Sequence, residues 1–466
     1  MSQFPVRILI APWGNPFSWR EAIYRLSESD RRVKGVTSTS LLAKELSPDL
    51  IIVSVPETLL SVRKLEEYGG KIISGNEDYK ELIYGLKLAI ERFFRENVGE
   101  FRMKVVVAPN VGEYGGIRWI LPERISPDSA YAAYILASLI LNTEEDVEIH
   151  LDTTHGVNFM PLAVYRAVLA ASRIISAMNN VRIKFSQYNS TPYPAHDRAE
   201  GIPELEVFKV KEEFITPVKA AQRLVYSYLS RDEIRIFRYA ISSRDLGDSH
   251  KILEERARKL HREAGPVASS VHYSMPLAFL QFSEIAEGGI DGLEELMEEI
   301  ISCVEVKREG RITVKHLILP SYEDLKSFLS ALSLISYGKN CISSIDGMRV
   351  EEGIVEARID ALSKAMEYLK GPLAEVAKNE IYSFREHLNE LAEEALKRKG
   401  EWVSMDGCEE SRRIMIAHAG LAKRAIELKI DENIWFRYKK ECLQRTEDVI
   451  RGILNDTRQM VKGEEW

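Results

Sequence analysis

The stretch VRILIAPWGNP, from Val6 to Pro16, decides the fold of the N-terminal half. Its first six residues are mostly apolar and predict a buried strand, and the following PWGNP predicts a tight turn. The same order of apolar run and polar turn returns at 147–158, VEIHLDTTHGVN. Both stretches therefore predict a strand that ends at a polar turn.

Further apolar runs follow along the N-terminal half. They are DLIIVSV at 49–55, KVVVAP at 104–109 and VRIKFSQY at 181–188. Stretches at 78–97 and 127–142 lie between them and carry apolar residues at helical spacing. Apolar strands that alternate with helices predict a largely parallel sheet covered on both faces. We therefore expect an α/β, Rossmann-like domain over residues 1–214.

The sequence changes in character after residue 214. Residues 215–264 predict a short helical linker module, of a size that suits a helix-turn-helix unit. The alternation at 304–319 predicts a hairpin that turns at Glu309-Gly310. Beyond Pro372 the chain has no proline, and apolar residues recur at helical spacing. We expect a mostly α-helical domain over 265–466, with the domain boundary between 210 and 265.

The composition is that of a globular protein. The chain has 466 residues, 45% hydrophobic and 29% charged, with 63 Lys and Arg against 71 Asp and Glu. Disordered, fibrous and collagen-like classes are excluded. The net charge of −8 at pH 7 does not favour bulk nucleic-acid binding, which needs clustered cations, but it leaves room for a local basic site.

Cysteines and apolar segments bear on the compartment. The four cysteines, Cys303, Cys341, Cys408 and Cys442, form no CxxC pair and are too far apart for a disulfide framework. We expect reduced cysteines in a cytoplasmic protein. The N-terminus lacks the features of a signal peptide, and no apolar run approaches the roughly 20 residues of a transmembrane helix, so we expect no membrane association.

Polar residues gather where the predicted strands end. The residues in question are Trp13, Gly14, Asn15 and Pro16 after the first run, Ser38 and Thr39 between the first two runs, Asp152, Thr153, Thr154, His155, Gly156 and Asn158 after the fourth, and Gln187 and Asn189 at the end of the fifth. In a parallel sheet, ligands bind outside the carboxyl ends of the strands. We therefore expect these residues to line a ligand site.

A predicted helix at 161–177 follows the Asp152–Asn158 turn. Free amides and the helix dipole at such a start favour phosphate, whereas a plain helix cap would need only one of these polar residues. The chain lacks GxxxxGK[ST] and GxGxxG, so neither a P-loop NTPase nor a dinucleotide oxidoreductase is supported.

A candidate catalytic pair lies near the C-terminus. Arg413 and His418 are five positions apart on a predicted helix. An Arg fork that holds phosphate and a His that titrates near neutrality suit RNA cleavage, in which the 2′-hydroxyl of the RNA is the nucleophile. The alternative without a catalytic role is a solvated Arg beside a structural His. No His or Cys grouping has metal-ligand spacing, so we expect no metal site.

In combination, these motifs resemble a known family. The Trp13–Pro16 turn, the Asp152–Asn158 turn and Arg413…His418-Ala419-Gly420-Leu421 are similar to those of the CRISPR-associated CARF–HEPN ribonucleases. Among these, the chain most resembles the archaeal Csx-one group of type III systems, with the Csm-six group as the near cousin. The resemblance covers nearly the whole chain in order.

The resemblance implies a function as well as a fold. It implies a homodimer, or a higher oligomer of dimers, whose CARF domains bind a cyclic oligoadenylate, cyclic tetra-adenylate in particular, made by the type III interference complex. This activator would switch on a metal-independent endoribonuclease that cleaves single-stranded RNA with Arg413 and His418 of both HEPN domains. It implies no other cofactor. The residue after the Arg is commonly polar in the family motif but is Ile414 here, which keeps Arg412 as an alternative to Arg413.

Two other functions fit parts of the sequence. One is a CARF-type transcription regulator that binds DNA through helices within 215–260. The other is a toxin-type HEPN nuclease or scaffold without a nucleotide ligand. The regulator would leave the long C-terminal half unexplained, and the toxin would leave the polar strand ends without a role.

Overall fold

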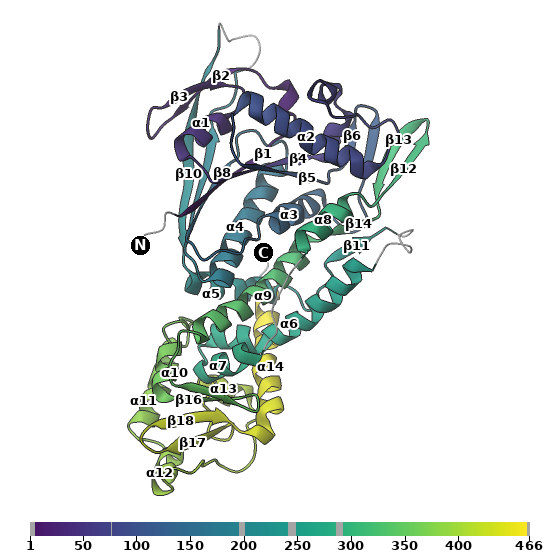
Figure 1. Cartoon of the computed structure of the whole chain (residues 1–466). Helices are drawn as coiled ribbons and strands as arrows, with labels where there is room; N and C mark the ends of the chain where they lie inside the picture. The colour runs from purple at the N-terminus through teal and green to yellow at the C-terminus, as the bar shows by residue number, and fades with distance from the viewer. Residues whose placement is uncertain (1–4, 76, 195–200, 241–247, 286–291, 464–466) are drawn as a thin grey trace.

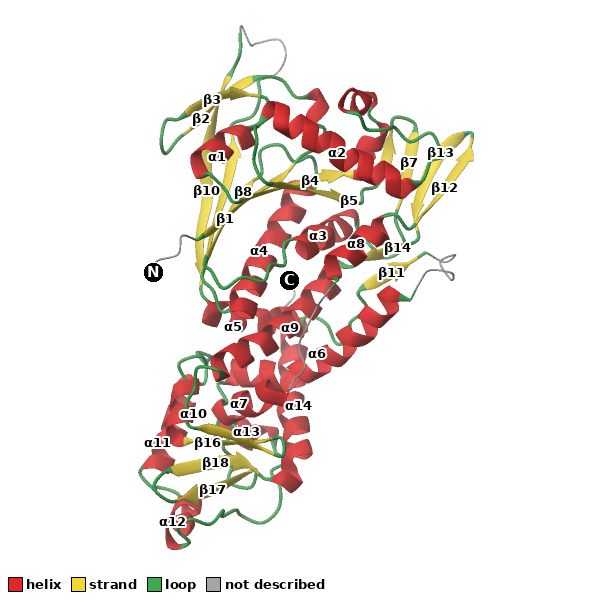
Figure 2. Cartoon of the chain, viewed as in Figure 1, coloured by secondary structure: helices red, strands yellow, loops and turns green. Residues whose placement is uncertain are grey.

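A computed structural model shows the arrangement of the chain (Figure 1). It describes residues 5–463 except 76, 195–200, 241–247 and 286–291. An α/β domain from the N-terminal half lies at one end and a smaller C-terminal domain at the other, with long helices between them (Figure 2).

All five predicted apolar runs are strands of one sheet. They are β1 (Val6–Pro12), β4 (Leu50–Pro56), β5 (Met103–Ala108), β8 (Val147–Asp152) and β9 (Ile183–Ser190). These five strands are parallel, in the order β9-β8-β1-β4-β5. Their side chains are buried because helices cover both faces. The Rossmann-like prediction is confirmed.

Three strands that the sequence analysis missed extend the sheet. They are β2 (Ala22–Leu26), β3 (Arg32–Gly35) and β10 (Glu204–Ile215). β10 runs antiparallel to β9, so the sheet of eight strands, β3-β2-β10-β9-β8-β1-β4-β5, is mixed. β10 alternates exposed and more buried residues, ELEVFKVKEEFI, and lacks the continuous apolar run by which the buried strands were found.

Helices cover the two faces of the sheet. α1 (Ser38–Leu46) and α2 (Tyr79–Asn97) lie on one face, and α3 (Pro127–Ser138) and α4 (Met160–Asn179) lie on the other (Figure 1). By length and composition α4 could cross a membrane, although no such segment was expected, and among the described residues it is the one helix that meets this test. In the fold, 67% of its apolar window is buried, because it is a core helix of this domain.

Long helices form the middle of the molecule. α5 (Pro217–Leu229), α6 (Ser249–Tyr273) and α9 (Tyr322–Ile342) pack together, and α5 and α9 also pack on α4. The segment 215–264, expected as a helical linker, contains α5, a short strand and the first part of α6, and α6 runs on beyond residue 264. Residues 241–247 of this segment lie outside the described part.

The predicted hairpin forms, but it belongs to the N-terminal side. β12 (Val304–Glu309) and β13 (Arg311–His316) pair across Gly310, whose φ of 74° suits glycine. β13 also pairs with β7 (Ile117–Ile120) in a sheet of four strands. The other short elements near this end are β6 (Gly112–Tyr114), β11 (Phe237–Tyr239), β14 (Ile318–Pro320) and α8 (Leu293–Ile301).

The C-terminal domain combines helices with a small sheet. Its helices are α7 (Pro276–Ile285), α10 (Ile359–Ala365), α11 (Ala374–Arg385), α12 (Glu390–Lys397), α13 (Arg412–Ala417) and α14 (Leu443–Gly463). Its strands are β15 (Met348–Glu351), β16 (Ile354–Arg358), β17 (Ile426–Ile430) and β18 (Ile434–Tyr438), in the order β15-β16-β18-β17. The helical content agrees with the prediction. The strands were missed because they are short.

One expectation about the cysteines is wrong. Cys408 and Cys442 form a disulfide, with their Cα atoms 5.6 Å apart, whereas Cys303 and Cys341 are free thiols. The two bonded residues are 34 positions apart in the chain. The intervening β17–β18 hairpin brings the chain back on itself, and the spacing of cysteines along a sequence does not report that return.

Candidate functional site

The turns after β1 and β8 meet where the strand order of the sheet reverses. β1 lies between β4 and β8: the next two parallel strands along the chain, β4 and β5, are added on one side of β1, and β8 and β9 are added on the other side. The Gly14 N–H donates a hydrogen bond of 3.0 Å to the carbonyl oxygen of His155. A Cβ atom at Gly14 would lie 2.2 Å from Cγ2 of Val157, so this close approach requires glycine. The two turns that the sequence singled out are therefore one structure.

Asp152 fastens the start of α1 to the end of β8. Its Oδ2 accepts hydrogen bonds from the hydroxyls of Ser38, at 2.7 Å, and Thr39, at 3.1 Å. Its Oδ1 accepts one from the Thr154 N–H at 3.1 Å. The Asp152 side chain is buried, and a buried carboxylate needs such donors. Asp152, Ser38 and Thr39 thus satisfy one another and shape the site.

His155 lies at the centre of the turn. Its Nε2 accepts a hydrogen bond of 3.1 Å from the Ser38 N–H and is 3.3 Å from the Tyr24 hydroxyl. Its ring lies 4.3 Å from that of Trp19. Burial lowers the pKa of His155 to about 4, although Asp152 opposes the shift. The ring is therefore neutral at pH 7, with Nε2 as acceptor and Nδ1 as N–H donor. The sequence analysis missed Tyr24 and Trp19, which no motif marks.

Trp13 differs from expectation. It is fully buried, its Nε1 donates to the Thr39 hydroxyl at 3.2 Å, and its ring stacks on Phe94 at 5.9 Å. Pro16 is buried as well and begins a short 3-10 helix. Both residues hold the turn from behind and do not line its open side, because their apolar surface is more stable in the core.

Other polar groups at the turns are left unpaired. Asn15 Oδ1 and Thr154 Oγ1 are buried and have no hydrogen-bond partner in the described part of the chain. Buried polar atoms are nearly always paired in folded proteins, so these two are available to a ligand. Asn158 is exposed, with a left-handed φ of 54°.

The remaining expected residues lie at the edge of the same site. The Thr153 hydroxyl is used within the sheet, because it donates to the Tyr188 carbonyl oxygen at 2.8 Å. Gln187 and Asn189 are half-buried on β9, which is the neighbour of β8. A Cβ atom at Gly156 would lie 2.5 Å from Cγ of Pro161, so glycine is needed here for packing.

The second site lies at α13. The Ser411 hydroxyl caps the helix by accepting from the Ile414 N–H at 3.3 Å. The helix ends at Ala417, because Ala419 and Gly420 have φ values of 49° and 78°. The helix was expected to include His418, which instead lies at its C-cap.

The two candidate arginines differ in their contacts. Arg412 donates from Nη1 to Asp456 Oδ1 on α14 at 2.8 Å. Arg413 is exposed, and within the described residues its side chain makes no hydrogen bond or ion pair. Of the two, Arg413 is the one whose guanidinium is free to bind a phosphate.

His418 is held by a residue that the sequence analysis missed. Its Nδ1 lies 3.2 Å from Glu380 Oε1, and 43% of its side chain is exposed. A carboxylate this close favours a proton on Nδ1, which in the neutral ring leaves Nε2 as the proton acceptor. Glu380 comes from α11, 38 positions earlier in the chain, and no local pattern links the two residues.

The two sites define a class of protein: a Rossmann-like sensor joined to a helical domain with an exposed Arg and His. Comparisons with known families agree. Residues 8–192 match the family model for the CARF domain of the CRISPR system endoribonuclease Csx1, and residues 371–441 match the model for its HEPN domain. The chain is also 25% identical to the CRISPR system endoribonuclease Csx1 of Methanocaldococcus jannaschii, over 96% of this chain and 94% of that protein.

The chain therefore belongs to the CRISPR-associated CARF–HEPN endoribonucleases, within the Csx1 group. The resemblance inferred from its motifs is confirmed, and so is its nature as an endoribonuclease. The HEPN match includes Glu380, Arg413 and His418, and the CARF match includes both turns of the sensor site.

Proposed function

We propose that this endoribonuclease is switched on by a cyclic oligoadenylate, cyclic tetra-adenylate in particular, made by a type III CRISPR interference complex. The observation that carries the proposal is the pair of buried, unpaired oxygens, Asn15 Oδ1 and Thr154 Oγ1, at the reversal of strand order. They accept hydrogen bonds from the adenosine ribose or base, while the His155 Nδ1–H and free turn amides donate to phosphate.

At the nuclease site, Arg413 binds the scissile phosphate of single-stranded RNA and stabilises the charge that grows on it. The Nε2 atom of His418 takes or returns a proton while the RNA 2′-hydroxyl attacks. Glu380 keeps the His418 ring in the tautomer that this transfer needs. Each role is filled by a side chain of this protein or by the RNA, so the proposed reaction is independent of metal.

We propose a homodimer as the active form. Arg413, in the first turn of α13, and His418, at its C-cap, are both partly exposed, so a partner subunit facing this surface would supply a second pair to a composite site. A ring-shaped activator on the two-fold axis suits such an isologous dimer. Higher oligomers of dimers, the domain limits at 214 and 264 and the cytoplasmic location stay predictions.

The test is RNA cleavage with and without added cyclic tetra-adenylate. We expect cleavage only with the activator and no loss of it in excess EDTA. Loss on chelation with rescue by a divalent ion would overturn the metal-independent mechanism. Equal cleavage without activator would support the toxin-type reading. The DNA-binding regulator is no longer favoured, because residues 371–441 match a nuclease domain.

A further inference from the structure

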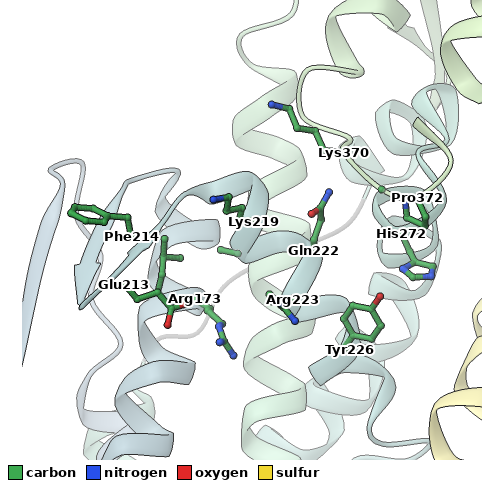
Figure 3. Close-up of a pocket in the computed structure, with 13 residues that line it drawn as sticks. Arg173, Glu213, Phe214, Lys219, Gln222, Arg223, Tyr226, His272, Lys370 and Pro372 are labelled. Carbon is green, nitrogen blue, oxygen red and sulfur yellow. The ribbon is translucent and has the colours of Figure 1, made fainter. Parts of the chain in front are cut away.

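A cavity of about 560 Å³ lies between the sensor and the nuclease domain (Figure 3). Its walls come from the end of α4 and β10, from α5, from the last turn of α6, and from the segment 370–372. Neither of the two sites described above contributes to it.

The cavity is lined by unneutralised cations. They are Arg173, Lys219, Arg223 and Lys370. None of these four side chains forms a hydrogen bond or ion pair with another described residue. The acidic residue of the lining, Glu213, is 2.9 Å from Lys211 and is neutralised by it. Four such cations at one cavity form an anion-binding surface, in a chain whose net charge is −8.

Aromatic and amide groups accompany the cations. Phe214 is 65% exposed and Tyr226 is 46% exposed. The ring of Tyr226 is held edge-on to His272, with centroids 5.7 Å apart. The Nε2 atom of Gln222 is buried and has no partner among the described residues. Exposed rings beside cations are the features that bind single-stranded nucleic acid, because bases stack on the rings while the cations bind phosphates.

The far wall of the cavity leads to the nuclease site. A Cβ atom at Gly371 would lie 2.2 Å from the carbonyl oxygen of His272, so the two segments are in direct contact. Helix α11 starts at Ala374, directly after this wall, and carries Glu380, which contacts His418. Six residues of helix span about 9 Å. The cavity and the catalytic His are therefore within reach of one RNA strand.

We propose that this cavity binds the sugar–phosphate backbone of the single-stranded RNA substrate, a few nucleotides from the bond that is cleaved. The proposal rests on the endoribonuclease activity of the family and does not depend on the identity of the activator. Lys219, Arg223 and Lys370 bind phosphates, and Tyr226 stacks on a base.

Charge reversal tests the site. Lys219→Glu and Arg223→Glu change exposed side chains, and Lys71→Glu, on the surface of the sensor domain, is the matched control. With an RNA of about 20 nucleotides, we expect each cavity variant to raise KM about tenfold. The slope of log KM against log salt concentration should fall by about 0.7 for each phosphate contact that is lost. The kcat and the activator concentration for half-maximal rate should stay within about twofold of the parent values, as in the control.

The length of the RNA substrate gives a second test of the proposal. A dinucleotide holds only the scissile phosphate and cannot reach the cavity as well, so its KM should be the same for parent and cavity variants. Direct binding of the longer RNA to the His418→Ala protein, followed by fluorescence anisotropy, should weaken in the same proportion as KM rises.

Three results would overturn the proposal. Unchanged KM for the longer RNA would show that the cavity does not bind the substrate. A change in the activator constant instead would assign the cavity to a small nucleotide. A change in subunit assembly, measured by light scattering, would assign it to contact between copies. Each of these differs from a lack of activator response in the parent protein, which bears on the proposed activation alone.

Discussion

The sensor turn and the nuclease turn differ in how far their polar side chains are buried and paired. At the sensor, Asp152 is 1% exposed and is bound by three donors, and His155 is neutral and held by backbone and Tyr24. At the nuclease, Arg413 is exposed and His418 is fixed by Glu380. A sensor needs a preformed shape, whereas the nuclease site that we propose a second subunit completes stays open in one chain. The predictions below test this contrast.

The largest effect should come from His418→Ala. Without proton transfer at this position, we expect cleavage to fall about 10²- to 10⁴-fold. Activator binding, measured by calorimetry on the same protein, should be unchanged, because the sensor turn lies in the other domain. Residual activity within a few-fold of the parent would remove His418 from the mechanism.

The next largest effect should distinguish the two arginines by their influence on kcat. Arg413→Ala should lower kcat about 10²- to 10³-fold, because charge on the phosphate loses its partner, and should leave the melting temperature unchanged. Arg412→Ala removes the contact to Asp456, so we expect a small loss of stability and most of the activity kept. The opposite ranking in kcat would make Arg412 the catalytic arginine.

At the sensor, Thr154→Val removes one unpaired hydroxyl and keeps the shape of the side chain. A hydrogen bond to a neutral ribose or base group is worth about 0.5–1.5 kcal/mol, so the activator concentration for half-maximal cleavage should rise roughly two- to tenfold. The maximal rate should change little, because a ligand shifts the active state only by its differential affinity. An unchanged activation curve would falsify the ligand-binding role of Thr154.

The smallest effect concerns pH and stability. The pKa of His155 is about 4 in the fold, below its usual 6.5, so the unfolded chain binds the extra proton between these values. The stabilisation is complete above pH 6.5 and is lost as pH falls toward 4. Between pH 7 and pH 5.5 we expect a loss of about 1 kcal/mol from this residue.

Denaturant unfolding of the parent and of His155→Asn at both pH values measures that loss. The buried His150, whose pKa is also lowered to about 4 by burial, contributes to both proteins and cancels in the difference. An equal pH dependence in parent and variant would contradict the assignment.

The sequence by itself determined the parts that local chemistry fixes. Continuous apolar runs predicted the five buried strands, because a strand covered on both faces has no polar side. The Gly14 and Asp152–Asn158 turns were marked by residues that suit tight turns and helix starts. The order of these motifs identified the family before any coordinate was known.

Only the tertiary structure decided what depends on residues far apart in the chain. It joined Glu380 to His418, Cys408 to Cys442, and the cations of three separate segments around one cavity. Trp13, which was expected at the edge of the ligand site, lies in the core instead. Side-chain roles of this kind are set by the neighbours that packing supplies, and a sequence names the side chains but not which of them meet.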